Sequence, residues 1–180
     1  MTATDLLNLP PIKINPITSK DSVRRFDCGE REVNTFFQRK AFKSAQQGRT
    51  KIFIATKEAN QLAIGAYSLT VSREQSQKLA TQDQKDIWSD GVPLIFIGYI
   101  GVHRSFQNMG LGRLLLIDAL KRANSVSKDV PFYGVGLRSL NDRTTTFYKR
   151  MGFNIAPGED NQPLMIIDIW SINSLFSPSQ

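Results

Sequence analysis

Apolar and polar positions alternate in some stretches of this chain and recur every three or four residues in others. Alternation over residues 11–17 predicts a first strand. Residues 51–56 and 62–71 are apolar, β-rich runs on either side of a polar turn, so they predict an antiparallel hairpin. Residues 73–92 are polar and charged, and they predict one short helix with a loop.

Helical spacing predicts the element between the first strand and the hairpin. The helix is expected to reach about Gln46 and to be ended by Gly48. At its start, Asp27 is followed three residues later by Glu30, which has the form of a capping box. The apolar residues on one face of this helix are Val33, Phe36, Phe37, Ala41 and Ala45.

The second half of the chain alternates between strands and helices. Each change of element is indicated by a change of apolar spacing or by a turn residue. The elements expected in order are a strand over 94–102, a helix ending near Ser125, a strand over 132–137, a short helix capped by Asn141 or Asp142, and a strand over 164–169. The whole order is β-α-β-β-β-α-β-α-β, which is a mixed α/β fold.

The length of 180 residues is enough for one domain with a substantial core. We expect a single domain over residues 1–180, with a loose arm at 1–10 and a C-terminal tail at 171–180. No apolar run is long enough to cross a bilayer, and the first residues lack the pattern of a signal peptide. Cys28 is the only cysteine, which fits a reducing cytoplasm, and with a single histidine no zinc site is expected.

Positive charge is concentrated in the first part of the chain. The net charge is +7, and residues 1–51 hold ten Lys or Arg against five acidic residues, a local excess of +5. A solvated surface explains such an excess, and so does a footprint for a polyanion such as nucleic acid. Charge alone leaves both interpretations open.

A glycine-bearing turn joins the strand at 94–102 to the helix after it. It has the sequence Gln107-Asn108-Met109-Gly110-Leu111-Gly112. A strand that passes through such a turn into a helix presents free backbone N–H groups and a positive helix end to an anion. The turn predicts a phosphate-bearing ligand, although turns of this kind also serve only to pack a helix on a sheet.

Two common phosphate-binding motifs do not fit this turn. A P-loop needs a Lys followed by Ser or Thr after its second glycine, and none stands here. A dinucleotide fold needs Gly-x-Gly-x-x-Gly early in a repeating βαβ unit, whereas three strand-like runs precede this turn.

The combination of three motifs is more specific than the turn alone. Gln-x-x-Gly-x-Gly after a strand, Asn141 at a strand end, and Phe147-Tyr148-Lys149-Arg150-Met151-Gly152-Phe153 together resemble the GNAT family of acetyl-CoA-dependent N-acetyltransferases. The resemblance covers residues 12–170. It implies a mixed, mostly antiparallel central sheet flanked by helices, with a splay between the fourth and fifth strands.

Two further segments narrow the resemblance. Arg25-Phe26-Asp27-Cys28-Gly29 before a helix, and Gly65-Ala66-Tyr67-Ser68-Leu69 on the third strand, are similar to the GNAT toxins of bacterial toxin–antitoxin modules. That resemblance implies transfer of acetyl from acetyl-CoA to the α-amino group of aminoacyl-tRNA, which blocks translation. It also implies a small ribbon-helix-helix antitoxin as a partner, and it is compatible with a homodimer.

The family resemblance assigns the cofactor-binding residues. The turn from Gln107 through Asn108, Met109, Gly110, Leu111 and Gly112 to Arg113 would surround the pyrophosphate of coenzyme A with main-chain N–H groups. The backbone of Ile100-Gly101-Val102 would pair with the pantetheine arm by strand addition. Phe147 is assigned to the cofactor site or to packing, and Asn141 to the pantetheine or to a helix cap.

Tyr148 is the expected catalytic residue. A phenol near the thioester sulfur can donate a proton as the thiolate leaves. No general base is evident. His103 is the only histidine, and it could relay a proton, although a surface or capping role is favoured. An α-amino group with a pKa of about 8 needs less help than a lysine with a pKa of about 10.4. Cys28 is interpreted as a packing residue rather than a nucleophile.

Three positions bear on the acceptor rather than on the cofactor. The related toxins often carry Arg where this chain has Tyr99, and Ala where it has Gly101. Arg138 stands where they hold other polar residues, so it is a candidate for setting acceptor preference. The residues expected to contact the nucleic-acid backbone are Arg24, Arg25, Arg39, Lys40, Lys43 and Arg49.

Two other functions are compatible with the sequence. One is a GNAT enzyme that acts on a small amine or a protein N-terminus, for which an acidic acceptor groove would be expected. The other is a non-enzymatic co-repressor that works with a ribbon-helix-helix partner on DNA. The intact glycine turn and Tyr148 favour an active enzyme over this last possibility.

Overall fold

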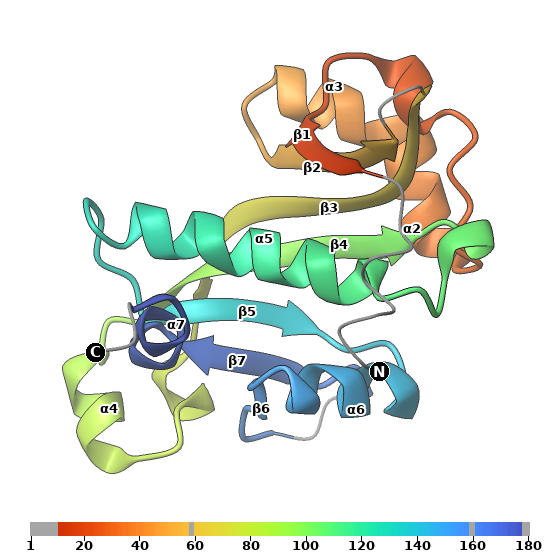
Figure 1. Cartoon of the computed structure of the whole chain (residues 1–180). Coiled ribbons are helices and arrows are strands. Elements are labelled where there is room, and N and C mark those ends of the chain that lie inside the picture. The colour runs from red at the N-terminus through yellow and green to blue at the C-terminus, as the bar shows by residue number, and fades with distance from the viewer. Residues whose placement is uncertain (1–10, 58–59, 159–160, 178–180) are drawn as a thin grey trace. The chain divides into compact units, whose positions relative to one another are not determined.

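The computed structural model describes residues 11–57, 60–158 and 161–177 (Figure 1). The predicted arm at residues 1–10 lies outside this range. Seven strands form one hydrogen-bonded sheet in the order β1-β2-β3-β4-β5-β7-β6. Their bounds are Ile12–Pro16 (β1), Lys51–Lys57 (β2), Asn60–Glu74 (β3), Val92–Val102 (β4), Gly134–Arg138 (β5), Asn154–Ile155 (β6) and Leu164–Asp168 (β7).

The pairing of the strands is mixed. β1 with β2, β2 with β3, β5 with β7, and β6 with β7 are antiparallel, whereas β4 and β5 are parallel. The parallel register runs from Leu94 opposite Gly134 to Ile97 opposite Leu137. The predicted mixed α/β sheet is therefore confirmed. The splay of the fourth strand from the fifth beyond this register stays a prediction.

Helices connect and cover the strands. Their bounds are Lys20–Val23 (η1), Arg31–Thr35 (α2), Phe36–Ala41 (η2, a π-helical turn), Phe42–Gln46 (α3), Ser76–Lys78 (η3), Gln82–Ile87 (α4), Arg104–Phe106 (η4), Leu111–Val126 (α5), Asp142–Arg150 (α6) and Ile169–Phe176 (α7). The short elements η1, η3, η4 and β6 have no periodic signal in the sequence. Helix α7 lies where a C-terminal tail was expected, and Asp168 caps it by accepting hydrogen bonds from the backbone N–H and the hydroxyl of Ser171.

By their contacts the residues divide into two compact units. The first contains the chain up to Thr70 together with Gly98–Ala119, and the second contains Val71–Ile97 together with the chain from Leu120. The first unit thus holds β1, β2, most of β3, the last part of β4 and the start of α5. The second holds β5, β6, β7, α4, α6 and α7. Each unit is described on its own.

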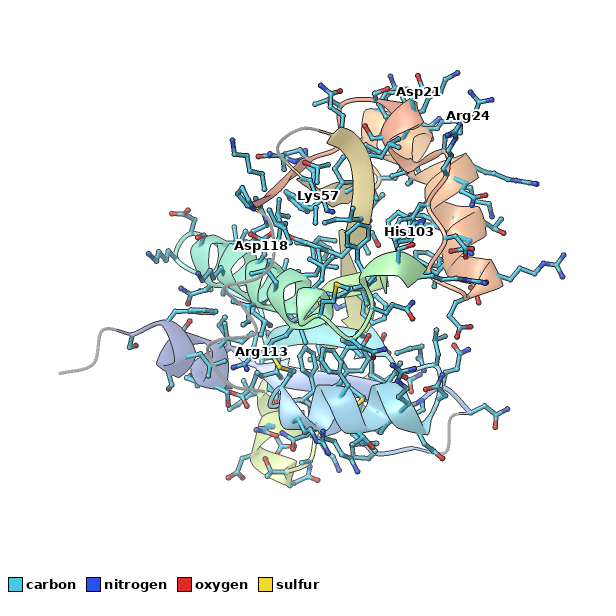
Figure 2. All side chains as sticks on the ribbon, turned by 45° about the vertical axis from the view of Figure 1, so that its right-hand side comes forward. Asp21, Arg24, Lys57, His103, Arg113 and Asp118 are labelled. Carbon is cyan, nitrogen blue, oxygen red and sulfur yellow. The ribbon has the colours of Figure 1, made fainter. Side chains whose placement is uncertain are left out.

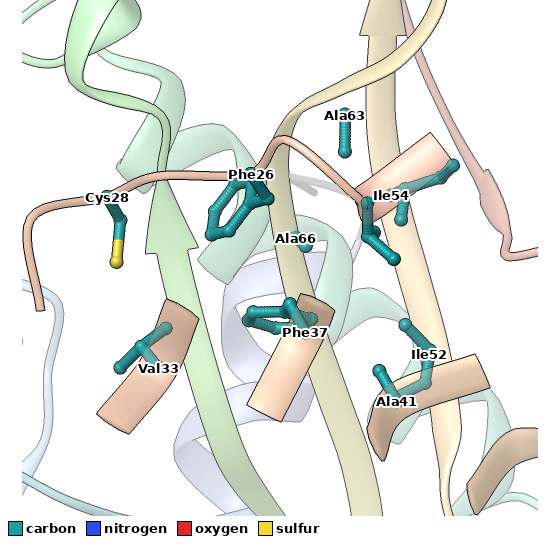
Figure 3. Close-up of a cluster of buried hydrophobic side chains, with 10 residues drawn as sticks. Phe26, Cys28, Val33, Phe37, Ala41, Ile52, Ile54, Ala63 and Ala66 are labelled. Carbon is teal, nitrogen blue, oxygen red and sulfur yellow. The ribbon is translucent and has the colours of Figure 1, made fainter. Parts of the chain in front are cut away.

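In the first unit, the consecutive helices α2, η2 and α3 pack against β2 and β3 (Figure 3). Val33, Phe37 and Ala41 are the buried residues of these helices, and they belong to one buried cluster with Ile52 and Ala66 of the strands. Phe36 and Ala45 are partly buried against the same cluster, so the predicted helix face is confirmed.

The predicted capping box at the start of this helix is wrong. The helix begins at Arg31, and its N-cap residue Glu30 makes no side-chain cap hydrogen bond. Gly29 has a φ of +95°, which turns the chain between Asp27 and the helix. The Asp27 carboxylate instead accepts hydrogen bonds from the Gly29 N–H at 3.0 Å and from the Asn34 amide at 2.7 Å.

Helix α5 packs on β3 within the first unit. A Cβ placed on Gly65 would lie 2.9 Å from a methyl carbon of Leu115, so the glycine permits the close approach of helix and strand. The hydroxyl of Tyr67 donates a hydrogen bond to Asp118, which Figure 2 labels on α5. Because Gly65 and Ala66 are adjacent in a strand, α5 and the α2–α3 segment lie on opposite faces of β3.

The second unit has a core of its own. It contains Leu79 and strand residues from β4 and β7, with Tyr133 before β5. Helix α7 is joined to this core by the edge-to-face contact of Trp170 with Tyr133, whose ring centroids are 5.9 Å apart. The core thus anchors the C-terminal helix on the same strands that precede and follow α6.

Candidate cofactor and catalytic site

The glycine turn has the backbone that a phosphate cradle needs. Gly110 has a φ of +80° and Asn108 a φ of +61°, so two residues of the turn adopt the left-handed conformation. A glycine adopts this conformation without the steric clash of a Cβ. The chain then enters α5, a helix of 16 residues, and the predicted strand–turn–helix is confirmed.

The start of α5 leaves several backbone donors without a helical partner. The first helical hydrogen bond runs from the Leu114 N–H to the Gly110 carbonyl at 3.1 Å. The N–H groups of Leu111, Gly112 and Arg113 precede that bond and have no carbonyl one turn earlier in the helix. The Leu111 side chain is buried. The Arg113 side chain is exposed, so it can add a positive charge at this helix end.

The main-chain N–H of Gln107, which was expected to face the pyrophosphate, is bonded within the chain instead. Its N–H bonds to the Arg104 carbonyl at 3.3 Å, so this donor is already used within the chain. Its side-chain amide donates to the carbonyls of Cys28 at 2.7 Å and Val102 at 3.0 Å. Gln107 thus fixes the turn to the end of β4 and to the Asp-Cys-Gly segment.

Arg104 also joins the Asp-Cys-Gly segment to the residues between β4 and the turn. The Arg104 N–H donates to the Asp27 carbonyl at 2.8 Å, and the Arg104 guanidinium lies 3.1 Å from the Asp27 carboxylate. The hydrogen bonds from Gly29 and Asn34, followed by the charge of Arg104, lower the pKa of Asp27. The Asp-Cys-Gly segment therefore supports the turn rather than capping the following helix.

Cys28 and His103 have structural roles within this segment. Cys28 is buried, its N–H donates to Asn34 at 2.8 Å, and burial raises the pKa of its thiol. A neutral buried thiol is a poor nucleophile, which confirms the interpretation of Cys28 as a packing residue. The His103 Nδ1 accepts a hydrogen bond from the Ser105 N–H at 3.3 Å, so this histidine caps η4.

The strand end before the turn is partly accessible. Ile100, Gly101 and Val102 are each intermediate in exposure. A Cβ on Gly101 would lie 3.2 Å from atoms of Cys28 and Val33, so the usual Ala would fit only if these neighbours moved slightly. The close approach of the Asp-Cys-Gly segment explains the glycine at this position.

Helix α6 of the second unit carries the other predicted site residues. Asn141 accepts a hydrogen bond from the Thr144 N–H at 3.0 Å, and the Thr144 hydroxyl accepts one from the Asn141 N–H at 3.1 Å. This is a full capping box, so the cap that the sequence suggested for Asn141 is confirmed. The assignment of Asn141 to the cofactor stays a prediction.

Tyr148 is buried on the inner face of α6. Its ring packs between Phe147, at 5.3 Å, and Phe153, at 5.9 Å between centroids. Burial raises the pKa of its hydroxyl to about 12. Within the described part of the chain, no hydrogen bond joins this hydroxyl to another residue. At neutral pH it is therefore a protonated phenol that can act as a donor.

The outer face of α6 is hollowed. A depression of about 420 Å³ is lined by Asp142, Arg143, Thr146, Phe147 and Arg150. An aromatic ring beside two guanidinium groups suits a ligand that has both a flat ring and phosphate charge. Phe147 therefore has one contact with Tyr148 and another with this depression.

The six basic residues assigned to nucleic acid are all exposed, and none of them forms an ion pair with a described residue. Arg24 and Arg25 follow η1, where Figure 2 labels Arg24 beside Asp21. Arg39, Lys40 and Lys43 lie on the η2–α3 segment, and Arg49 follows it. The structure thus places all six in the first unit, around one helix.

Comparison with known proteins identifies the class of protein. Residues 48–155 match the family described as acetyltransferase (GNAT) domain. This match covers more than half of the chain, and it includes the glycine turn and Tyr148. The chain belongs to the GNAT acetyltransferase family, and it is an acetyl-CoA-dependent N-acetyltransferase.

Individual relatives are similar over most of the chain. The tRNA-acetylating toxin of Mycobacterium tuberculosis is 25% identical over 141 residues, which are 78% of this chain and 83% of the relative. A structure of AtaT complexed with acetyl-methionyl-tRNAfMet has a TM-score of 0.83 and 27% identity, covering 93% of this chain and all of the other. A tyrosine-to-phenylalanine mutant of AtaT, bound to the C-terminus of the antitoxin AtaR and to acetyl-CoA, has a TM-score of 0.75 and 25% identity, covering 92% and 98%.

Several supporting residues could not be recognised from the sequence. Asn34 and Arg104 hold the Asp-Cys-Gly segment, and Ser68 accepts a hydrogen bond from the Tyr99 N–H at 2.9 Å. Each contact joins segments that are far apart in the chain or uses a common polar residue in no recognisable pattern. Of these three residues, only Ser68 lies inside a motif that resembles the toxins, and its side chain is buried.

Proposed function

We propose that this chain is a toxin that transfers acetyl from acetyl-CoA to the α-amino group of aminoacyl-tRNA and so blocks translation. The observation that carries the proposal is the similarity over 93% of the chain to AtaT, solved with acetyl-methionyl-tRNAfMet. The exposed basic residues of the first unit support a polyanionic acceptor.

The residues of the glycine turn suit the pyrophosphate of acetyl-CoA. The N–H groups of Leu111, Gly112 and Arg113 stand at a positive helix end, and Gly110 permits close approach of a phosphate. Asn108 and Met109 are exposed beside them. The backbone of Ile100–Val102 would pair with the amides of pantetheine, and Phe147 with the two arginines of α6 would contact the nucleotide.

Acetyl-CoA supplies an acetyl group that is activated as a thioester. Tyr148 would donate its phenolic proton to the sulfur that leaves when the amine attacks the carbonyl carbon. A pKa of about 12 keeps that proton in place at physiological pH. The acceptor needs no strong base, because an α-amino group has a pKa of about 8 and is partly neutral there.

The six basic residues would bind the sugar–phosphate backbone of the tRNA. Contacts of this kind release counterions, so affinity falls steeply as salt is raised. They are sequence-independent, and they would position the charged 3′ end without reading the rest of the tRNA.

The AtaT complex also supports a protein partner. AtaT binds the C-terminus of its antitoxin AtaR. We infer that an antitoxin, of the ribbon-helix-helix class, restrains this chain, and that the chain can form a homodimer.

No described helix is long and apolar enough to span a membrane. Because charged tRNA is the acceptor, the cytoplasm is the proposed site of action.

The test is transfer of radiolabelled acetyl from acetyl-CoA to a pool of charged tRNAs, with uncharged tRNA, a polyamine and a peptide as parallel acceptors. Label should enter only the charged RNA, as N-acetyl-aminoacyl groups. Label in the polyamine or peptide and none in RNA would instead identify a small-amine or N-terminal acetyltransferase. No transfer to any acceptor, with binding to operator DNA beside a partner, would favour the co-repressor function.

A further inference from the structure

Tyr99 belongs to a side-chain cluster that the chemistry described above does not use. Its ring stacks on Phe36, with centroids 3.9 Å apart and an interplanar angle of 11°. Phe37 meets the same ring edge-on at 6.5 Å. Burial raises the pKa of the Tyr99 hydroxyl, and the nearby carboxylate of Glu32, which is exposed, raises it further. The cluster thus presents an aromatic surface with one carboxylate at its edge.

A π-helical turn places Phe36 over Tyr99. In the turn Phe36–Ala41 the helix is wider than an α-helix, so consecutive residues can both face the sheet. The rings of Phe36 and Phe37 lie 5.3 Å apart, with Phe37 fully buried and Phe36 only partly. π-helical turns are rare and are frequent at functional sites. Here the turn leaves an aromatic ring at the rim of the core.

The cluster lies on the face of β4 that is turned toward α2. Side chains two residues apart in a strand share a face, and a Cβ on Gly101 would meet Cys28 and Val33 of the α2 side. Tyr99 is therefore directed to that side, and Ser68 fixes its backbone N–H. Helix α5, whose start carries the phosphate cradle, covers the opposite face of β3.

We propose that Phe36, Tyr99 and Glu32 form the surface that selects the aminoacyl group of the acceptor. This inference rests on the proposed function. If the pyrophosphate lies at Leu111–Arg113 and the pantetheine along Ile100–Val102, the thioester end reaches β4 next to Tyr99. An amine that attacks there brings its own side chain against the stacked rings.

The chemistry of the cluster specifies a preference. Stacked, half-buried rings favour apolar or aromatic aminoacyl groups, because contact removes apolar surface from water. The Glu32 carboxylate attracts the α-ammonium group and repels a second carboxylate. Methionyl and phenylalanyl groups should therefore be accepted in preference to aspartyl and glutamyl groups.

The helix that carries Phe36 also carries basic residues. Lys43 follows Phe36 by seven residues, roughly 10 Å along a helix. A tRNA end whose phosphates contact Arg39, Lys40 and Lys43 would therefore have its terminal aminoacyl group near the Phe36–Tyr99 stack. The basic residues of this helical segment would bind the tRNA phosphates, and Phe36 would contact the aminoacyl group.

The experiment compares one tRNA body charged in vitro with Met, Phe, Ala, Asp or Lys, and measures kcat/KM for each. In the wild type, Met and Phe should exceed Asp by at least tenfold. Tyr99→Ala should reduce this preference at least fivefold, whereas Tyr99→Phe, which keeps the stack, should retain most of it. Glu32→Gln should raise the relative use of the Asp form by about fivefold, and its exposed position makes loss of folding no explanation.

Lys40→Ala is the matched control on the same helix. It should lower kcat/KM for all five charged forms by one common factor, because a phosphate contact does not sense the amino acid. A common factor for Tyr99→Ala and Glu32→Gln as well would overturn the inference while leaving the proposed function intact. Failure of the wild type to acetylate any charged form would overturn the proposed function instead.

Discussion

Helices α5 and α6 both follow a strand of the sheet, but their first turns differ in how the backbone N–H groups are bonded. Helix α5 comes after β4 and helix α6 after β5, and predicted site residues lie at the start of α5 and within α6. The residue before α5 is Gly110, which has no side chain to cap the helix and leaves the first N–H groups without helical partners. The residue before α6 is Asn141, whose side chain closes a complete capping box with Thr144.

The difference indicates a backbone role for the start of α5 and a side-chain role for α6. An open helix start can bind an anion directly through its N–H groups. At the capped start of α6 the Asn141 and Thr144 N–H groups are already bonded within the cap, so we propose that α6 acts through the side chains of Phe147 and Tyr148. Substitutions in the two segments should therefore fail in different ways.

The largest effect is expected at α6. Tyr148→Phe should lower kcat by about 10²–10⁴-fold, because it removes the proposed proton donor and leaves the ring packing intact. The affinity for acetyl-CoA, measured by calorimetry, should be unchanged. Tyr133→Phe, a change to another buried tyrosine of the same unit, is the control and should keep full turnover. Normal turnover by Tyr148→Phe would remove Tyr148 from the chemical step.

The next effect is expected at α5. Gly110→Ala should weaken acetyl-CoA binding about tenfold or more, since an L-residue at a φ of +80° costs about 1–2 kcal/mol and the turn must shift to relieve it. Gly48→Ala is the control for strain alone, because Gly48 also has a positive φ and open space around it. Equal binding by both variants would contradict the cradle.

The pH dependence of folding should separate Tyr148 from the other tyrosines. Its pKa is about 12 in the folded chain and about 10 when unfolded, so the folded state binds more protons between these values. The stability is complete below pH 10 and should fall by about 2–3 kcal/mol as the pH rises to 12. Urea unfolding at pH 9.5 and 11.5 should show about 1.5–2 kcal/mol of this loss in the wild type. The loss should be smaller by that amount in Tyr148→Phe, and equal losses would mean that the hydroxyl is not buried.

The smallest effect is expected at the cap of α6. Asn141→Ala should destabilise the chain by about 1 kcal/mol, and Asn141→Asp should restore most of it. Acetyl-CoA affinity in Asn141→Asp then tests the cofactor role, because aspartate keeps the cap and lacks the amide N–H group. Unchanged affinity would leave Asn141 as a cap only.

Much of this fold could be predicted from local patterns. The helix face of Val33, Phe37 and Ala41, the hairpin, and the strand–turn–helix around Gly110 follow from periodicity and turn chemistry. The GNAT fold and the enzyme class are confirmed by the family match, and the resemblance to the toxins by the AtaT structures. The assignments of individual site residues stay predictions.

The features that could not be predicted from the sequence are contacts between residues distant in the chain and the backbone conformation of single glycines. Gln107 was expected to offer its N–H to phosphate, but Arg104 takes that N–H and the side chain bonds to Cys28. The Asp27–Glu30 spacing matched a capping box, but the positive φ of Gly29 moved the helix start. Neither the partner of a side-chain amide nor a backbone reversal at one glycine is encoded in residue spacing.

The bond between Gln107 and Cys28 has a consequence for how the protein matures. It joins residues 79 positions apart, so the phosphate cradle is fastened only when both segments have been made and folded together. Contacts of such sequence separation form slowly, because the loop between them must close first. A growing chain shorter than about 110 residues lacks the turn altogether, so no N-terminal fragment of that length could carry out acetyl transfer while it is still being synthesised.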